Sequence, residues 1–216
     1  MGKTAIILGA SGLTGGLLLQ NLLDDTSYDR VKLFSRASVG LKTTKVEEHL
    51  IDLFKLERYD QEFTGDVVFC CIGTTKAKTP NEELYRKIDH GIPVSAATLA
   101  KMNHIETIVV VSALGADPKS RIFYNRTKGE MEQEILQLDI KNTYILQPSL
   151  IGGKRGEKRS GESAAKFFMN IFGFLVPKKY KMIKPEIIAR AMQKVASEGY
   201  SMSRIPSEKI KEIATL

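Results

Sequence analysis

Residues 4–16 of the chain read TAIILGASGLTGG, an apolar run that passes directly into a glycine-rich turn. The glycines at 9, 12 and 15 have the spacing G-x-x-G-x-x-G. Such glycines let the chain leave a strand sharply, let its backbone approach a pyrophosphate, and let the next helix pack closely on the sheet. That helix also presents free N–H groups and the positive end of its dipole to phosphates. The alternative is a glycine-rich turn that binds no ligand. We predict a dinucleotide site with these contact residues: Gly9, Ser11, Gly12, Leu13, Thr14 and Gly15.

Short β-branched runs and longer amphipathic segments alternate along the rest of the first 150 residues. Strands are expected at 4–9, 30–35, 46–52, 67–72, 107–112 and 143–147, and helices at 13–23, 82–102 and 124–138. Residues 108–111 (IVVV) are apolar throughout, as a strand covered on both faces must be. The pattern predicts an α/β fold of the Rossmann type, a doubly wound parallel sheet.

The alternation stops after Ser149. Residues 152–161 (GGKRGEKRSG) have a loop composition, and helices are expected at 163–174, 185–197 and 207–214. The segment is too short for a separate domain. We expect one domain in which residues 1–150 form the nucleotide-binding core and 151–216 a small helical substrate cap over the carboxyl edge of the sheet. The apolar stripe at 163–176 is assigned to packing, although an exposed stripe could contact a partner protein or a membrane surface.

Composition narrows the class of protein. The 216 residues include 32 Lys and Arg against 25 Asp and Glu, a net charge of +7, which suits a nucleic-acid-binding protein or an enzyme with a phosphate-bearing ligand. The basic runs at 154–159 and 178–181 are interrupted and accompany no recognition motif, so no nucleic-acid partner is expected. No apolar stretch reaches the roughly 18–20 residues of a membrane span. The start does not resemble a signal peptide, and a cytoplasmic location is expected.

Cysteine and histidine usage points to a reducing compartment and to no metal site. Cys70 and Cys71 are adjacent, so on a strand their side chains face opposite sides of the sheet and an ordinary disulfide between them is not expected. No other cysteine and only three histidines are present, so a structural zinc site is not predicted either.

The end of the second expected strand suggests the type of nucleotide. Ser35 and Arg36 lie there, and Arg36 is 21 positions after Gly15. An acidic residue at this place binds the ribose 2′-hydroxyl of NAD, whereas an arginine accommodates the 2′-phosphate of NADP. No Asp or Glu occurs between Val31 and Gly40. We therefore predict that NADP(H) is preferred over NAD(H), with a solvated surface arginine as the alternative.

Two more strand ends are expected at the same cleft. Asp52, followed by Leu53, ends the third strand, and its carboxylate could accept a hydrogen bond from the adenine amino group. Cys71, Ile72 and Gly73 end the fourth, where a glycine lets the backbone pass close to the cofactor ribose. Either could also be an ordinary strand-to-loop turn.

Three polar residues have the spacing of an acid–base centre. Ser112 ends the fifth expected strand, and Tyr124 and Lys128 lie one turn apart on the helix that follows. A neighbouring ammonium stabilises a phenolate and makes tyrosine a usable general acid or base. The serine could hold a substrate carbonyl beside the nicotinamide. An isolated Y-x-x-x-K sequence occurs often by chance and usually lies on the surface. Here it follows a strand-end serine in a chain with a nucleotide-binding turn, which makes the pattern specific.

Through the glycine turn, Ser112 and the Tyr124–Lys128 pair, the chain resembles the short-chain dehydrogenase/reductase superfamily. It looks most like the atypical NAD(P)H-binding members related to Tat-interacting oxidoreductase-like and sugar-nucleotide epimerase-like proteins. The resemblance covers residues 1–153 well and the rest loosely. It implies that Pro148 and Leu150 border the nicotinamide. The superfamily's helical asparagine has no clear match, since only Asp89 or His90 lies in that region.

The resemblance also implies roles. Tyr124 would exchange a proton with the substrate oxygen, Lys128 would lower the pKa of that phenol and bind the nicotinamide ribose, and Ser112 would orient the carbonyl. An NADP(H)-dependent oxidoreductase acting on a small carbonyl or alcohol is therefore expected. The alternative is an NADPH-binding sensor that regulates a protein partner with little turnover.

Overall fold

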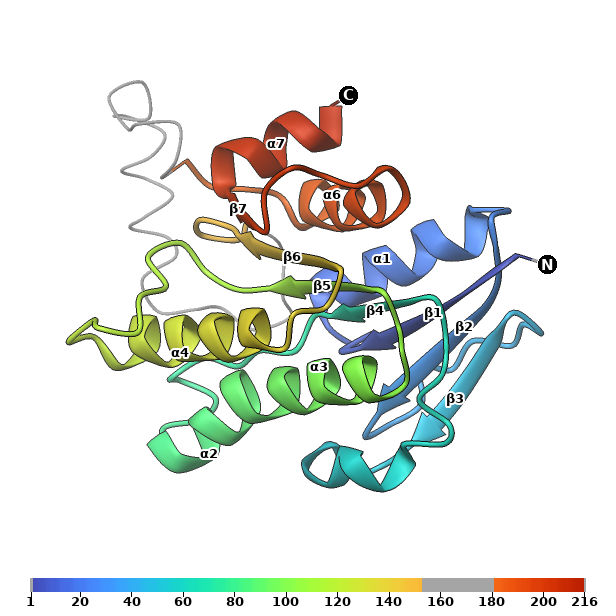
Figure 1. Ribbon diagram of the computed structural model, residues 1–216, viewed down its shortest axis with the longest axis horizontal. Helices are drawn as coiled ribbons and strands as arrows, with labels where there is room; N and C mark the ends of the chain where they lie inside the picture. The colour runs from blue at the N-terminus through green and yellow to red at the C-terminus, as the bar shows by residue number, and fades with distance from the viewer. Residues whose placement is uncertain (1, 153–180, 216) are drawn as a thin grey trace.

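A computed structural model describes residues 2–152 and 181–215, which form a parallel β-sheet flanked by helices (Figure 1). Seven strands are present in this part of the chain, in the order β3-β2-β1-β4-β5-β6-β7. Every pairing is parallel. The strands are β1 (Lys3–Leu8), β2 (Tyr28–Ser35), β3 (Val46–Leu50), β4 (Val67–Cys70), β5 (Thr107–Val111), β6 (Asn142–Gln147) and β7 (Arg204–Pro206).

Both faces of the sheet are buried, which explains the continuous apolar strands. In β1, Ala5 and Ile7 belong to one hydrophobic cluster and Ile6 and Leu8 to the other, because successive side chains point to opposite faces. All four side chains are fully buried. The predicted doubly wound α/β fold is confirmed.

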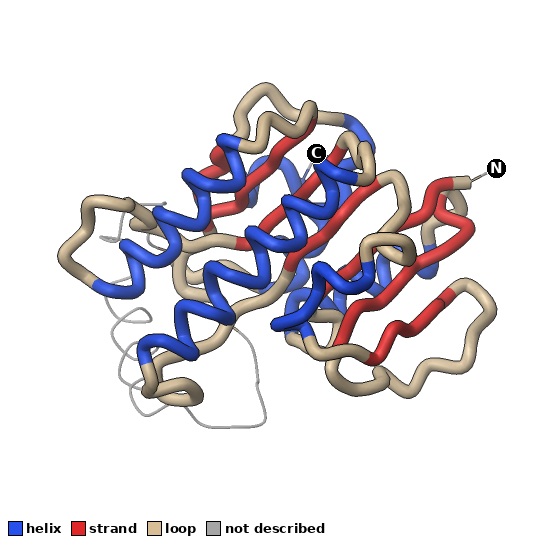
Figure 2. The backbone as a smooth tube through the Cα atoms, turned by 60° about the horizontal axis from the view of Figure 1, so that its bottom comes forward, coloured by secondary structure: helices blue, strands red, loops and turns tan. Residues whose placement is uncertain are grey.

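Helices cover the two faces in separate layers. On one face, α1, α6 and α7 pack against the sheet, and on the other lie η1, α3 and α4. Figure 2 shows the second layer in front of the strands. The helical elements are α1 (Leu13–Asp24), η1 (Leu53–Tyr59), α2 (Glu82–Arg86), η2 (Lys87–Gly91), α3 (Ile92–Met102), α4 (Phe123–Gln137), α6 (Pro185–Glu198) and α7 (Ser207–Thr215).

The helix predicted at 82–102 is continuous but irregular. A π-helical turn, η2, separates α2 from α3 and contains Asp89. Such turns are uncommon and frequently occur at functional sites. The short 3-10 segment η1 was not predicted; it begins with the side chain of Asp52 accepting a hydrogen bond from the N–H of Phe54.

The described part of the C-terminal segment is helical, as predicted, but its place differs. Helices α6 and α7 pack on the same sheet face as α1 instead of lying over the carboxyl edge, and β7 pairs with β6 as a seventh strand. This strand has three residues and ends in Pro206, too short a run to predict from its pattern. The helix expected at 163–174 and the basic residues 154–159 lie outside the described residues. No helix in the described ranges is long and apolar enough to cross a membrane.

Tyr28, at the start of β2, carries a buried hydroxyl that finds no hydrogen-bond partner among the described residues. Burial, and then the charges of Asp25 and Asp66, raise the pKa of Tyr28 to about 12. Because the phenol ionises more readily in the unfolded chain, the protein keeps its full stability below the unfolded pKa of about 10 and loses part of it as pH rises through the folded pKa.

We expect Tyr28→Phe to leave the free energy of unfolding unchanged at pH 7, or to raise it by about 1 kcal/mol, because an unsatisfied buried hydroxyl is removed. Urea denaturation between pH 9 and 12 should show a smaller alkaline loss than in the wild type. Tyr144→Phe is the matched control, since that hydroxyl accepts from the N–H of Tyr200 at 3.1 Å and its removal should destabilise. Equal alkaline losses in wild type and Tyr28→Phe would contradict the assignment.

Candidate cofactor and substrate site

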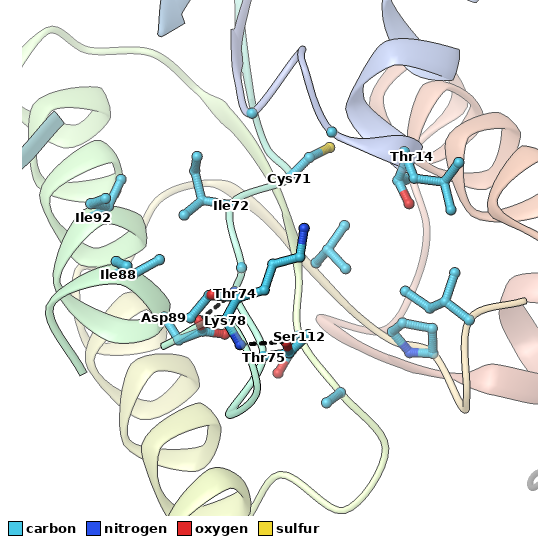
Figure 3. A pocket seen from close by; sticks show the side chains of 18 of the residues that line it. Thr14, Cys71, Ile72, Thr74, Thr75, Lys78, Ile88, Asp89, Ile92 and Ser112 are labelled. Atoms are coloured by element: carbon cyan, nitrogen blue, oxygen red, sulfur yellow. Dashed lines mark hydrogen bonds between the residues drawn. The ribbon is translucent and has the colours of Figure 1, made fainter. Parts of the chain in front are cut away.

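A pocket of about 1440 Å³ lies at the carboxyl ends of the strands, where open α/β sheets bind ligands. It is lined by the turns after β1 to β6, by η2 and by the start of α4. Figure 3 shows Ile88, Asp89 and Ile92 on its helical wall, Thr14 on the opposite side, and Cys71 between them. The predicted site residues that line it are Gly9, Ser11, Gly12, Leu13, Thr14, Arg36, Asp52, Leu53, Cys71, Ile72, Gly73, Ser112, Tyr124, Lys128, Pro148 and Leu150.

The glycine turn has the geometry that a pyrophosphate needs. Gly9 has φ +87°, which favours glycine, and a Cβ there would lie 3.0 Å from the backbone of Cys71. Gly12, the N-cap of α1, donates its N–H to the carbonyl of Gly9 at 2.9 Å and provides no side-chain cap. The first N–H groups of α1 are thus available to a bound phosphate.

Two predicted contacts, Gly15 and Ser35, do not line the pocket. A Cβ at Gly15 would overlap the carbonyl oxygen of Gly9, so this glycine permits the close packing of α1 on the turn. Ser35 is buried, and its hydroxyl donates to the carbonyl oxygen of Ala37 at 2.8 Å. Both residues support the turns that shape the pocket.

The ends of β2 and β3 supply one end of the pocket. Arg36 is exposed there. The Asp52 carboxylate accepts from the N–H of Phe54 at 3.0 Å and lies 3.8 Å from Nζ of Lys55. It thus caps η1 while its side chain remains half exposed, so it can still accept a hydrogen bond from a ligand.

The turn after β4 forms the floor of the pocket. Burial raises the pKa of the Cys71 thiol, which therefore stays protonated, and its Sγ lies 3.8 Å from Sδ of Met192. A Cβ at Gly73 would meet Oδ1 of Asp89 at 3.5 Å, an ordinary contact. The space beside Gly73 is thus limited by Asp89, a residue that the sequence pattern did not assign.

Tyr124 and Lys128 both line the pocket, and Lys128 has a buried charged partner. Nζ of Lys128 lies 3.0 Å from Oδ1 of Asp89, and both side chains are almost fully buried. The other carboxylate oxygen of Asp89 accepts from the N–H of Thr74 at 2.7 Å. Burial alone would lower the pKa of Lys128, but the charges of Asp89 and Tyr124 and the hydrogen bond to Asp89 outweigh it and raise that pKa. An ammonium is thus held one helical turn after Tyr124.

Ser112 also lines this pocket. It is buried, and its hydroxyl donates to Oε1 of Glu132 at 2.5 Å. The sequence pattern had assigned no role to Glu132. It could have been noticed, because it follows Lys128 by four positions on the same helix face.

We expect Asp89→Asn to lower the free energy of unfolding by about 3 kcal/mol at pH 7, because it leaves the buried ammonium of Lys128 without a carboxylate. The amide keeps the shape and can still accept from the N–H of Thr74. Since the pair raises the pKa of Lys128, its stabilisation is complete below about pH 10.4 and is lost as pH rises through the folded pKa. The deficit of the variant should therefore shrink at alkaline pH in urea denaturation. Glu82→Gln is the control: its pair with Lys76 is exposed, so a loss under about 1 kcal/mol is expected.

Proteins with similar sequences place the chain in a family. It is 33% identical to the protein HTATIP2 of Rattus norvegicus over 81% of this chain and 76% of that protein. It is 32% identical to the mitochondrial protein FMP52 of Eremothecium gossypii, over 76% and 74% of the two chains. The chain belongs to the HTATIP2 and FMP52 family. It is an atypical protein of the short-chain dehydrogenase/reductase type that binds NAD(P), as the resemblance implied. Residues 4–122 also match the family model of the semialdehyde dehydrogenase NAD-binding domain.

Solved structures of other proteins have the same overall fold as this chain. L-threonine 3-dehydrogenase of Trypanosoma brucei aligns with a TM-score of 0.72 at 14% identity, over 97% of this chain and 78% of that one. MoeE5, in complex with UDP-glucose and NAD, aligns with a TM-score of 0.70 at 17% identity, over 93% and 74%. At these identities the likeness concerns the fold alone.

The relatives also correct one expectation. A cytoplasmic location was expected from the sequence, but the FMP52 proteins of four yeasts and fungi in the family, including Saccharomyces cerevisiae, are named mitochondrial. The cytoplasmic prediction was wrong because it rested only on not finding a membrane-spanning stretch or a signal-peptide pattern. Neither observation indicates the compartment in which a protein resides.

Proposed function

We propose that the chain is an NADP(H)-dependent oxidoreductase acting on a small carbonyl or alcohol. The observation that carries this proposal is the meeting of Ser112, Tyr124 and Lys128 with the glycine turn in one pocket. A protein that only bound a nucleotide would need the turn, but it would not need a tyrosine one helical turn from a buried ammonium.

The residues present fit a nicotinamide dinucleotide. The uncapped start of α1 and the space kept free by Gly9 suit the pyrophosphate. Arg36 suits a ribose 2′-phosphate, because a guanidinium binds phosphate with two parallel hydrogen bonds. When bound, the nicotinamide supplies the hydride. Lys128 would hold the neighbouring ribose, and Pro148 and Leu150 would border the ring.

Tyr124 is the proposed general acid and base. Its side chain is 39% exposed at the pocket, so a substrate oxygen can reach the phenol. The ammonium of Lys128 favours the phenolate and makes the proton easier to release. Asp89 holds that ammonium in place from below, at 3.0 Å. Ser112 would contact the same substrate oxygen and fix its position.

The decisive experiment combines binding and turnover. Mass spectrometry of nucleotide that co-purifies with the chain should find NADP(H), and NADPH should bind more tightly than NADH in a fluorescence titration. The chain contains no tryptophan, so fluorescence of the reduced nucleotide can be followed with little protein background. A panel of small aldehydes, ketones and quinones should then give oxidation of NADPH. Tight NADPH binding without turnover of any carbonyl would favour the sensor, and binding of neither nucleotide would refute both.

A further inference from the structure

The turn of residues 74–79, between β4 and α2, presents polar side chains to the pocket that have no role in the proposed function. Thr74, Thr75, Lys78 and Thr79 all line the pocket. Figure 3 shows the first three of them grouped near Asp89. Three of the side chains carry hydroxyls and one carries an ammonium, so the turn can donate several hydrogen bonds to a ligand.

Hydrogen bonds within the turn fix its shape. The carbonyl oxygen of Thr75 accepts from the N–H groups of both Lys78 and Thr79, at 2.9 Å each. The hydroxyls of Thr74 and Thr79 bond to each other at 2.8 Å. Thr79 is buried, whereas Lys78 is exposed where it lines the pocket. The turn is therefore closed by its own hydrogen bonds, while Lys78 stays accessible to a ligand.

Two series of contacts place this turn beside the proposed acid–base centre. The N–H of Thr74 donates to Asp89 at 2.7 Å, and Asp89 pairs with Lys128 at 3.0 Å. The hydroxyl of Tyr85 donates to the carbonyl oxygen of Thr74 at 3.4 Å, and the Tyr85 ring contacts that of Tyr124 edge-on. Both series begin at Thr74. A small substrate whose oxygen contacts Tyr124 therefore has this turn beside it.

The carboxylates near this centre are compensated by cations of the chain. Asp89 is paired with Lys128. Glu132, which accepts from the hydroxyl of Ser112, does not line the pocket, and it forms an ion pair with Arg204 of β7 at 2.8 Å. Neither carboxylate thus repels an anionic ligand as an isolated charge would.

The other charged residues of the pocket lie at two separate places. Arg36 and Asp52 follow β2 and β3, which lie on the far side of β1 from β4 and β5. Among the described residues that line the pocket, Lys78 is the remaining charged side chain, and it follows β4, next to the strand that ends before Ser112. Its ammonium adds a positive potential at the substrate end of the pocket, which favours an anion.

We propose that Lys78 and the threonines of this turn bind an anionic group of the substrate, a carboxylate or a phosphate a few atoms from the carbonyl or alcohol. The inference rests on the proposed function and names its substrate class. An ammonium has three N–H donors, so Lys78 can contact the anion and a protein group together. The anionic group is unchanged in the reaction; its binding holds the carbonyl in place at Tyr124.

Two pairs of aldehydes test the inference on the full chain. 4-Oxobutanoate is compared with methyl 4-oxobutanoate, and glyceraldehyde 3-phosphate with glyceraldehyde, so the members of each pair differ in the anionic group. The readouts are kcat/KM with NADPH, the dissociation constant of NADPH, and Tm. The wild type should prefer the anionic member of at least one pair by about tenfold or more, as a charge-assisted hydrogen bond provides. The pair with the larger preference distinguishes carboxylate from phosphate.

Lys78→Met removes the charge and keeps nearly the length of the side chain. It should lower kcat/KM for the preferred anionic aldehyde by about tenfold to a hundredfold, and that for its neutral counterpart by less than about twofold. NADPH affinity should not change. Lys78→Arg should keep most of the preference, because a guanidinium also binds carboxylates and phosphates. Since Lys78 is exposed, both variants should have the Tm of the wild type.

Lys76→Met is the matched control. Lys76 belongs to the same turn, pairs with Glu82 at 2.8 Å and does not line the pocket. This variant removes the same charge a short distance away, so kcat/KM for all four aldehydes should equal that of the wild type. A loss as large as that of Lys78→Met would show a general effect of net charge and overturn the inference.

Three other results would overturn the inference and leave the proposed function standing. They are an anionic preference that persists in Lys78→Met, a wild type that reduces the neutral members as well or better, and a wild type that reduces other carbonyls but none of these four. Weaker NADPH binding by Lys78→Met would assign Lys78 to the cofactor and overturn the inference too. A wild type that binds NADPH and reduces no carbonyl would overturn both.

Discussion

Tyr124→Phe is expected to lower kcat for carbonyl reduction by about 10²- to 10⁴-fold, the usual contribution of a positioned general acid. The dissociation constant of NADPH should stay unchanged, since the glycine turn and Arg36 lie elsewhere in the pocket. The ring also remains, including its edge-on contact with Tyr85 at 6.3 Å. The change therefore removes the proton donor and little else, and stopped-flow measurement of NADPH oxidation gives the rate directly.

The matched control for this variant is Tyr59→Phe. Tyr59 lies in η1, packs against the apolar cluster beneath the sheet, and does not line the pocket. Its turnover should equal that of the wild type. A Tyr124→Phe protein with a wild-type rate would show that the proton reaches the substrate from another group, and the acid–base assignment would fall.

Arg36→Glu is expected to weaken NADPH binding by about a hundredfold or more, because it removes a charged hydrogen-bond donor and places a carboxylate beside the 2′-phosphate. NADH has a hydroxyl at that position and should bind nearly as before, or somewhat more tightly, since an acid there can accept from the hydroxyl. The ratio of the two dissociation constants, from fluorescence titration at fixed ionic strength, is the quantity to measure.

Arg30→Glu is the control for the effect of net charge. Arg30 lies near the start of β2, whereas Arg36 directly follows the end of that strand, and Arg30 pairs with Glu47 on the surface. It should alter both nucleotides' affinities slightly and equally. If Arg36→Glu also weakened both equally, the argument from the 2′-phosphate would be lost, although the pyrophosphate turn would remain.

The centre of the sheet could be predicted because its strands are covered on both faces. Residues such as Ile6, Ile7 and Val109 are buried whichever way they point, so the sequence signal is a short apolar run followed by a turn. Strand β7 escaped prediction because three residues ending in Pro206 give no such run. Its place depends on tertiary packing between β6 and α7.

The candidate site was predictable where function requires a residue type at a fixed place along the chain. Gly9, Gly12 and the Tyr124–Lys128 pair are such cases, and all four line the pocket. The buried carboxylates Asp89 and Glu132 were not assigned, because their partners come from distant turns and strands that the sequence does not bring together. Gly15 and Ser35 were predicted as cofactor contacts but do not line the pocket, since a pattern cannot separate a contact from its support.

The ion pair between Arg204 and Glu132 can form only late in the synthesis of the chain, because Arg204 is made long after Glu132. A ribosome delivers the glycine turn, Ser112 and Tyr124 long before Arg204 emerges, so a nascent chain can form most of the sheet while Glu132 still lacks its cation. A product stopped just short of β7 would hold a buried carboxylate without a counter-charge. Proteases that remove incomplete chains would then encounter a chain with a nucleotide-binding fold whose Glu132 carboxylate has no counter-charge.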